Sequence, residues 1–186
     1  MRYLNFYSSP LGKIILASDG KDLTGLSFSA QSPFGTANEK GGGDADLPVF
    51  EESKHWLDAY FKGNNPGKIP PISFEGATPF QKRVWGILLT IPYGETMTYG
   101  EIAKEIEIET GKRASSQAVG GAVGRNPLSI VVPCHRVMGA NGDLTGYAGG
   151  MKRKAALLRI EGNGASSFRL PKTRKDEKRR SRNENL

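Results

Sequence analysis

A segment rich in proline, glycine and asparagine, residues 64–71, is the feature that most restricts how this chain can fold. Such a composition disfavours helix and strand interiors and is typical of a boundary between two folding units. The 186 residues are enough for one ordinary domain or two small ones, each with its own buried core. We therefore expect an N-terminal unit over residues 1–71, a second unit over 72–162, and a separate tail over 163–186.

The positive charge of the chain is concentrated in that tail. The formal net charge is +7, and residues 163–186 supply +5 of it through eight Lys/Arg and three Asp/Glu. A basic protein suits a polyanionic partner such as nucleic acid, but the body of this chain carries only a small excess of positive charge. We predict that the tail is disordered, so any case for DNA binding has to rest on motifs in the body.

Cys134 is the only cysteine, which excludes a disulfide within the chain and a cysteine-based zinc site. The N-terminus has no apolar segment of signal-peptide length, and no window approaches the roughly 18 apolar residues of a membrane span. We therefore expect a soluble, cytoplasmic protein in a reducing compartment, with no metal and no membrane partner.

The first unit has the pattern of a small antiparallel sheet followed by a helix. Strands are predicted over 3–8, 12–18 and 23–28, with the turns Ser-Pro-Leu-Gly and Ser-Asp-Gly-Lys between them. Residues 29–47, rich in Ser, Gly and charge, predict a loop, and apolar residues at helical spacing occupy 50–61. The fold class is therefore α/β of the α+β kind, with the sheet confined to the first unit.

The second unit is predicted to be mainly helical. Thr78 can cap one helix with Pro79 at its first position, and Thr98 can cap another with Glu101 completing a capping box. Further along, the pattern predicts a helix over 114–124, a short strand over 130–132, a loop over 137–147 and a final helix over 151–161. The second and third helices, joined by the polar turn 110–112, are typical of a helix-turn-helix, although plain helical hairpins share this pattern.

The helix over 114–124 is unusual because it contains Gly120, Gly121 and Gly124. Each interior glycine costs a helix about 1 kcal/mol relative to alanine. One explanation is close packing of this helix against a neighbour. The other is a helix thin enough to enter a DNA groove and bring its backbone against the phosphates or the minor-groove floor.

Free cysteines are usually buried and inert, so Cys134 taken alone predicts a core residue. Its neighbours change that interpretation, because Pro133 interrupts the predicted strand, His135 follows and Arg136 adds positive charge, all of which favour a thiolate nucleophile. Adjacent side chains on a strand point to opposite faces, so a water or a local turn would have to connect Cys134 with His135. A buried core residue is the alternative for His135.

Four motifs surround the cysteine: Ala118-Val119-Gly120-Gly121-Ala122, Asn126-Pro127, Pro133-Cys134-His135-Arg136-Val137 and Gly146-Tyr147-Ala148-Gly149-Gly150. Together they closely resemble the O6-alkylguanine-DNA alkyltransferases, also called methylated-DNA-protein-cysteine methyltransferases. The resemblance extends from about residue 78 to residue 162, and the early strand hairpin is similar to that family's small N-terminal α/β domain. The zinc of some members' N-terminal domains has no cysteine ligands here.

The resemblance implies a role for each matching residue. Cys134 would accept the alkyl group, His135 would act on it through a water, and Glu161 would polarise the histidine. Taken alone, Glu161 predicts only an exposed carboxylate at a helix end. The residues implied in binding the flipped base are Tyr99, Asn126, Tyr147 and the backbone at Cys134, Val137 and Ala148. Those implied in DNA contacts are Gln117, Ala118, Gly121, Arg125 and Arg136.

One position departs from the family pattern. The family commonly has an arginine where this chain has Gln117, and that arginine fills the gap left by the extruded nucleotide. Glutamine can hydrogen-bond the orphaned base but adds no charge, so we expect weaker DNA affinity or base flipping. Arg113 or Arg125 can compensate.

The implied function is direct DNA repair by a monomer without a cofactor. An alkyl group of O6-alkylguanine in double-stranded DNA, with O4-alkylthymine as an open second substrate, would move to Cys134 once and stay there. Two alternatives remain. A DNA-binding sensor or helix-turn-helix regulator would need no cysteine. A Cys-His hydrolase would turn over an ester or amide without DNA, and apart from Glu161 the sequence offers it no third orienting group.

Overall fold

A computed structural model of the chain describes residues 2–29, 46–164 and 168. Most of the predicted loop over 29–47 and almost all of the basic tail over 163–186 lie outside these residues. None of the helices within the described part of the chain has the length and apolar character needed to cross a membrane.

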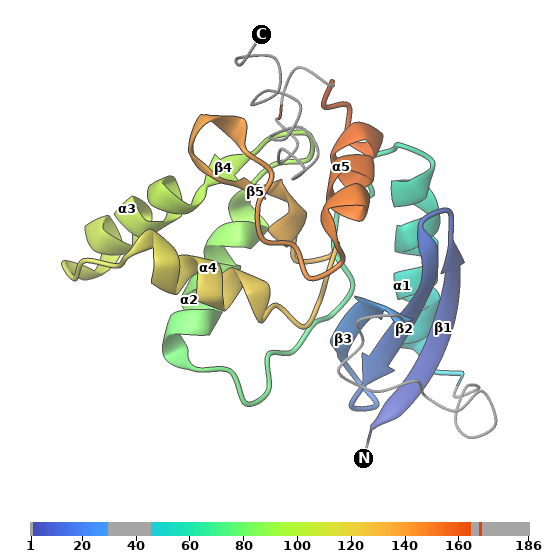
Figure 1. The fold of residues 1–186 in the computed structure, drawn as a ribbon. Coiled ribbons are helices and arrows are strands. Elements are labelled where there is room, and N and C mark those ends of the chain that lie inside the picture. The colour runs from blue at the N-terminus through green and yellow to red at the C-terminus, as the bar shows by residue number, and fades with distance from the viewer. Residues whose placement is uncertain (1, 30–45, 165–167, 169–186) are drawn as a thin grey trace, which may run out of the picture.

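The N-terminal region forms a three-stranded antiparallel sheet of β1 (Tyr3–Ser9), β2 (Gly12–Ser18) and β3 (Leu23–Phe28), in that order. Helix α1 (Pro48–Phe61) packs against all three strands (Figure 1). The predicted strands and helix are confirmed, although α1 begins two residues earlier than predicted, because proline is tolerated in the first turn of a helix.

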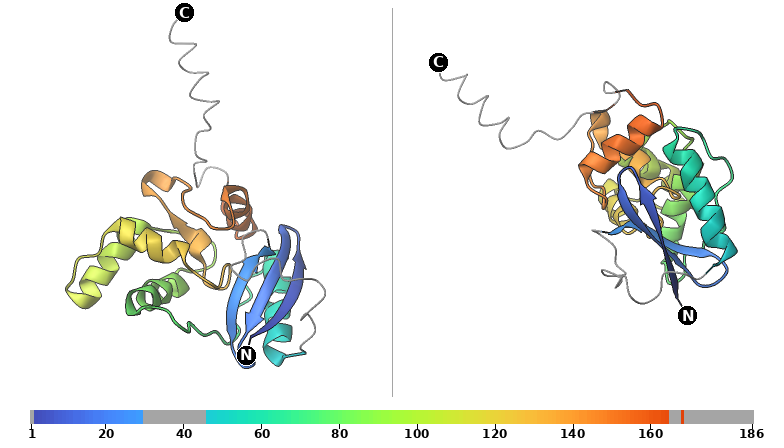
Figure 2. Two further views of the ribbon diagram at one scale, coloured as in Figure 1. Left: turned by 60° about the horizontal axis from the view of Figure 1, so that its bottom comes forward. Right: turned by 90° about the vertical axis from the view of Figure 1, so that its right-hand side faces the viewer.

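The second region contains α2 (Pro79–Thr90), α3 (Tyr99–Thr110), α4 (Ser116–Gly124) and α5 (Met151–Ile160). Both predicted caps are present, since Thr78 accepts from the Gln81 N–H and Thr98 from the Glu101 N–H. Gly111 ends α3 in the left-handed conformation that glycine favours. Helices α2, α3 and α4 pack together on the side away from the sheet, and α5 lies between them and α1 (Figures 1 and 2).

Two predictions near Cys134 were wrong. Residues 130–132 are not a strand, because Ile130 has a φ of 72° and turns the chain; a β-branched residue rarely adopts this conformation, which costs about 1–3 kcal/mol. Residues 137–147 are not all loop, because β5 (Val137–Met138) pairs in parallel with β4 (Met97–Thr98) and a 3₁₀ turn, η3, covers Ala140–Gly142. Both features depend on distant partners that local patterns do not reveal.

The sheet and the helical region share one hydrophobic core, which runs from Ile14 and Leu26 to Val84 and Val132. Backbone hydrogen bonds also join them: the Leu26 N–H donates to the Pro127 carbonyl, and the Ser129 N–H donates to the Leu26 carbonyl, each at 2.8 Å. The edge of the N-terminal sheet therefore holds the segment that leads to Cys134.

Candidate active site and nucleic-acid interface

Cys134 is the first residue of a 3₁₀ turn, η2 (Cys134–Arg136), and is only 4% exposed. Burial raises the pKa of its thiol, and the Asn126 amide and the Lys154 charge oppose that rise only in part. The thiol is therefore protonated in the resting protein, and it becomes a nucleophile only when its proton leaves. The turn replaces the strand geometry that would have placed Cys134 and His135 on opposite faces.

His135 follows Cys134 in the same turn, is completely buried and contacts Glu161. The distance from its Nε2 atom to the Oε1 atom of Glu161 is 2.6 Å. Its Nδ1 atom is buried and has no hydrogen-bond partner within the described part of the chain. If Nε2 carries the proton donated to the carboxylate, Nδ1 is unprotonated and can accept a proton. The structure thus brings together the predicted pair of His135 and Glu161.

Glu161 is not the exposed helix-end carboxylate that its sequence position alone predicts, since it is only 5% exposed. Its Oε1 atom also accepts a hydrogen bond from the Tyr60 hydroxyl at 2.7 Å. Its Oε2 atom accepts hydrogen bonds from Nε of Arg136 at 2.8 Å and from the Gly94 N–H at 3.2 Å. Burial alone would raise the pKa of Glu161, but hydrogen bonds from His135 and Arg136, together with the Arg136 charge, hold it well below its usual range.

Burial lowers the pKa of His135 against the opposing pull of Glu161, so the ring is uncharged near neutral pH. The permanent charge of Arg136 is therefore what keeps Glu161 ionised while the histidine is neutral.

Arg136, which we predicted to contact DNA, lies inside the protein in the described structure. Its side chain is 8% exposed, and its guanidinium donates to Glu161 and, at 2.6 Å, to the carbonyl of Ile91. The guanidinium therefore points into the protein interior. Arg136 lies in the 3₁₀ turn η2, which directs its side chain differently from the predicted strand. The nearby cation acting on the thiol is Lys154 rather than Arg136.

Lys154 is a functional candidate that sequence reasoning missed. It is fully buried on α5 and donates to the carbonyls of Val137 and Thr145, the latter at 2.7 Å. Burial lowers its pKa to about 8, against an opposing effect of Cys134. Lysines are rarely buried, so nothing in the helical pattern of 151–161 indicated this position. Lys154 therefore links Val137 to Thr145, the residue just before the motif that contains Tyr147 and Ala148.

The residues implied in base binding lie around the thiol. The Asn126 amide donates to the Val132 carbonyl at 2.8 Å and accepts the Leu128 N–H, so it ties the end of α4 to the segment before Cys134. The Tyr99 hydroxyl donates to the Thr145 carbonyl at 3.3 Å. Asn126 and Ala148 line a common cavity of about 300 Å³.

Gly149 packs against Tyr147. A Cβ atom at Gly149 would come within 2.3 Å of the Tyr147 ring, so only glycine fits there. The Tyr147 ring is itself buried, and Val137 is buried with its carbonyl already accepting Lys154.

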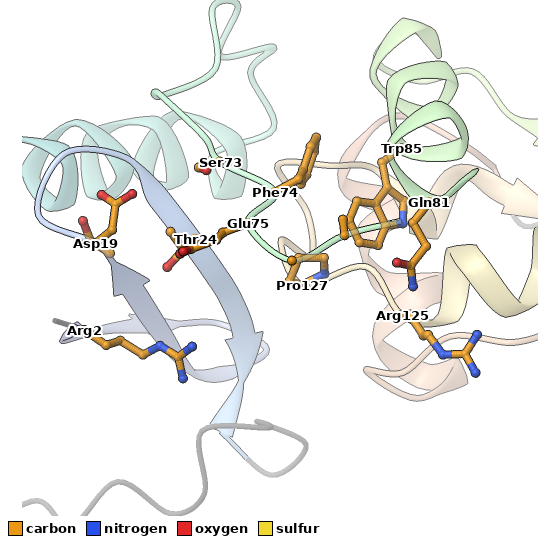
Figure 3. Close-up of a pocket in the computed structure, with 13 residues that line it drawn as sticks. Arg2, Asp19, Thr24, Ser73, Phe74, Glu75, Gln81, Trp85, Arg125 and Pro127 are labelled. Carbon is orange, nitrogen blue, oxygen red and sulfur yellow. The ribbon is translucent and has the colours of Figure 1, made fainter. Parts of the chain in front are cut away.

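The other residues implied in DNA contacts lie together on the exposed face of α4 and its C-terminal end. Gln117, Ala118, Gly121 and Arg125 line one groove of about 700 Å³, whose opposite wall is the start of α2. Arg125 also borders a second depression of about 640 Å³, which reaches past Trp85 to the edge of the sheet at Thr24 (Figure 3). The predicted DNA-contact residues on α4 are therefore exposed, whereas Cys134 is buried.

The glycines of α4 are not required by packing within the described structure. A Cβ at Gly124 would have no neighbour within 4 Å, one at Gly121 would lie 3.6 Å from the flexible end of Arg125, and one at Gly120 would lie at an ordinary 3.8 Å from Tyr99. Gly121 and Gly124 are exposed. Packing within the described residues therefore does not require glycine at these positions, and the groove-binding explanation remains a prediction.

A family model described as the DNA binding domain of 6-O-methylguanine DNA methyltransferase matches residues 79–163, and one described as its ribonuclease-like domain matches residues 2–67. The chain belongs to this methyltransferase family. The methylated-DNA-protein-cysteine methyltransferase of Methanosarcina acetivorans is 44% identical over 169 residues, covering 87% of this chain and 99% of the relative. That of Mycobacterium leprae is 46% identical over 157 residues, covering 82% and 88%.

Solved methyltransferase structures share the fold. The O6-methylguanine methyltransferase of Mycobacterium tuberculosis is 43% identical with a TM-score of 0.74, covering 87% of this chain and 93% of that one. A structure of the M. tuberculosis OGT in complex with DNA is 44% identical with a TM-score of 0.73, covering 86% and 92%. The predicted resemblance to this methyltransferase family and the mixed α+β fold are confirmed.

Proposed function

We propose that this protein repairs O6-alkylguanine in double-stranded DNA by moving the alkyl group to Cys134. The observation that carries the proposal is that Cys134 and His135 are buried in one turn, where Nδ1 of the histidine has no hydrogen-bond partner within the described residues and Nε2 is held by Glu161. That arrangement supplies a base for a thiol that must lose its proton. The methylated-DNA-protein-cysteine methyltransferases similar to this chain carry this activity in their names.

The step is a nucleophilic substitution at the alkyl carbon. The Cys134 proton passes to His135 through a water, sulfur forms a bond to the carbon, and the bond from carbon to O6 breaks. Guanine leaves with that electron pair and takes up one proton, which restores the normal base. The resulting thioether has no good leaving group, so each chain reacts once.

The target base has to leave the helix, because its O6 substituent is out of reach of a protein thiol inside a stacked duplex. Gln117, Ala118, Gly121 and Arg125 would face the minor groove from α4. Tyr99, Asn126, Tyr147 and the backbone at Val137 and Ala148 would hold the flipped base beside the thiol. The regions 1–71 and 72–162 would act as two units, and a thiol that must stay reduced suits the cytoplasm.

A test on the DNA product separates this function from a sensor and from a hydrolase. Duplex DNA with one O6-methylguanine is incubated with increasing amounts of protein, digested, and its nucleosides are separated. We expect O6-methylguanine to fall and guanine to rise in proportion to protein, one lesion per chain. An unchanged lesion would favour a sensor, and continued turnover would exclude a single-use acceptor.

Gly121→Ala is expected to stabilise the protein and weaken DNA binding. In a helix interior, alanine raises the free energy of unfolding by about 0.5–1 kcal/mol relative to glycine. A methyl group in the α4 groove would weaken DNA binding by about the free energy of one hydrogen bond, which is about 2–10-fold in Kd. Both are measured on a Cys134→Ala background, by denaturant unfolding and by titration of a lesion-containing duplex.

The matched control for this change is Gly86→Ala, an exposed glycine inside α2 with no neighbour within 4 Å and outside the groove lining. It should give the same gain in stability with no change in Kd. Equal Kd values for the two variants would contradict a DNA-facing role for Gly121.

Gln117→Arg is expected to bind DNA more tightly and to react faster, because it restores a positive charge at an exposed position of α4. One added phosphate contact steepens the dependence of log K on log salt by about 0.9. Binding is measured at several salt concentrations together with the single-turnover rate. Equal rates and equal salt slopes would show that glutamine does not limit this protein.

A further inference from the structure

Tyr60 contacts the proposed proton relay of Cys134, His135 and Glu161 from outside the region that carries the cysteine. It lies on α1, and its hydroxyl donates to Oε1 of Glu161 at 2.7 Å while lying 3.2 Å from Nε2 of His135. Tyr60 is completely buried, with its ring stacked on Trp56 and edge-on to Tyr93. Burial raises the pKa of this hydroxyl, so it remains a donor throughout the working range of pH.

The Oε1 atom of Glu161 is thus shared among three donors that compete for it, because Nη2 of Arg136 also donates to it, at 3.1 Å. His135 approaches it at 2.6 Å and Tyr60 at 2.7 Å. An acceptor that already receives a hydrogen bond attracts a second proton less strongly, so the Tyr60 hydroxyl weakens the hold of Glu161 on the histidine proton.

We propose that Tyr60 is a positioning residue of the relay, and that its hydroxyl, by occupying Oε1 of Glu161, keeps His135 uncharged until the thiol proton arrives. The proposal rests on the proposed function and deepens it, because a histidine that is already protonated cannot accept that proton. It also gives the N-terminal region a direct part in the chemistry, since the relay is incomplete without α1.

The other charged and titratable groups around His135 act in known directions. Glu161 at the end of α5 favours the charged ring, whereas Arg136 on η2 and Lys154 on α5 disfavour it. Cys134 precedes the ring on the same turn. Tyr93 lies against Arg136, but its hydroxyl donates to the backbone carbonyl of Ile160 rather than to the carboxylate.

Tyr60→Phe removes the hydroxyl and keeps the ring. One lost hydrogen bond to Oε1 should raise the pH at which His135 takes up a proton by about 0.5–1 unit. The chain has two histidines, and the other, His55, is exposed on α1, so histidine-labelled protein gives two signals and an internal reference. The pH titration is followed by NMR, and the single-turnover rate on O6-methylguanine DNA is measured over the same range.

We expect the pH midpoint of the His135 titration and the low-pH side of the pH–rate profile, its acid limb, to shift together to higher pH, with the His55 signal as the unchanged reference. On the acid limb, the rate should fall about 3–10-fold below wild type, because a shift of 0.5–1 unit changes the neutral fraction by that factor. Tyr93→Phe is the matched control, since it deletes a neighbouring hydroxyl that donates to Ile160 rather than to Glu161, and it should leave the His135 midpoint in place.

Two outcomes would overturn the proposal: an unchanged His135 midpoint in Tyr60→Phe, or an equal shift in Tyr93→Phe. If Tyr60→Phe does not fold, 3-fluorotyrosine placed at position 60 is a stronger donor and should lower the His135 midpoint, and no change there would also overturn it. If wild type transfers no alkyl group, the proposed function fails while the NMR titration still decides the role of Tyr60.

Discussion

Cys134→Ala is expected to abolish alkyl transfer completely while leaving DNA binding within about twofold of wild type. Alanine removes the only thiol of the chain, and the exposed surface on α4 is formed by other residues. The loss of one buried sulfur should cost about 1 kcal/mol of unfolding free energy, too little to unfold the protein. Transfer is measured with an O6-methylguanine duplex, and binding by titration of the same duplex.

The control for Cys134→Ala is chemical. Wild-type protein that has first reacted with a thiol-blocking reagent should lose transfer in the same way. Residual transfer by Cys134→Ala would show that another group accepts the alkyl, and a large loss of DNA binding would show that the thiol region itself shapes the DNA surface.

Glu161→Gln is expected to lower both the rate and the stability. The neutral amide cannot stabilise a protonated His135, which should cost about 10²–10⁴-fold in single-turnover rate, the range of general acid-base catalysis. It also leaves the charge of Arg136 buried without its partner, which should cost about 3–5 kcal/mol of unfolding free energy. The two effects are measured by rapid-quench kinetics and by denaturant unfolding.

The stability effect of Glu161→Gln should depend on pH. The folded-state pKa of Glu161 lies below its unfolded value, so its contribution is fully present above about pH 4.3 and is lost as pH falls through the folded value. The difference in unfolding free energy between wild type and variant should therefore shrink in acid.

A matched control for Glu161→Gln is Glu109→Gln, which breaks an exposed pair with Arg83. It should change unfolding free energy by at most about 1 kcal/mol and leave the rate alone. Equal effects of the two substitutions would contradict the relay.

Local patterns in the sequence predict the elements that are held by local interactions. The caps at Thr78 and Thr98 depend on neighbours three positions away, and the three N-terminal strands pair through short turns; the structure has both where they were expected. The packed helix pair α3 and α4 follows from the same kind of signal, with Gly111 ending its first helix.

Features held by distant contacts were missed or misplaced. The contact between Tyr60 and Glu161 spans 101 positions, and no periodic pattern links them. Ile130 would be expected in an extended strand, but pairing of its neighbours with β3 forces it to a positive φ. That turn and the 3₁₀ turn after it explain why Arg136 points inward to Glu161 instead of toward DNA.

The most direct test of the account is the mass of the intact protein after reaction. Wild-type chain is incubated with excess duplex containing O6-methylguanine, weighed by mass spectrometry, and digested to locate the modification. The account predicts a gain of one methyl group on Cys134 that saturates at one equivalent and is absent with undamaged DNA. An unchanged mass with loss of the lesion, or a methyl group on any other residue, would contradict it.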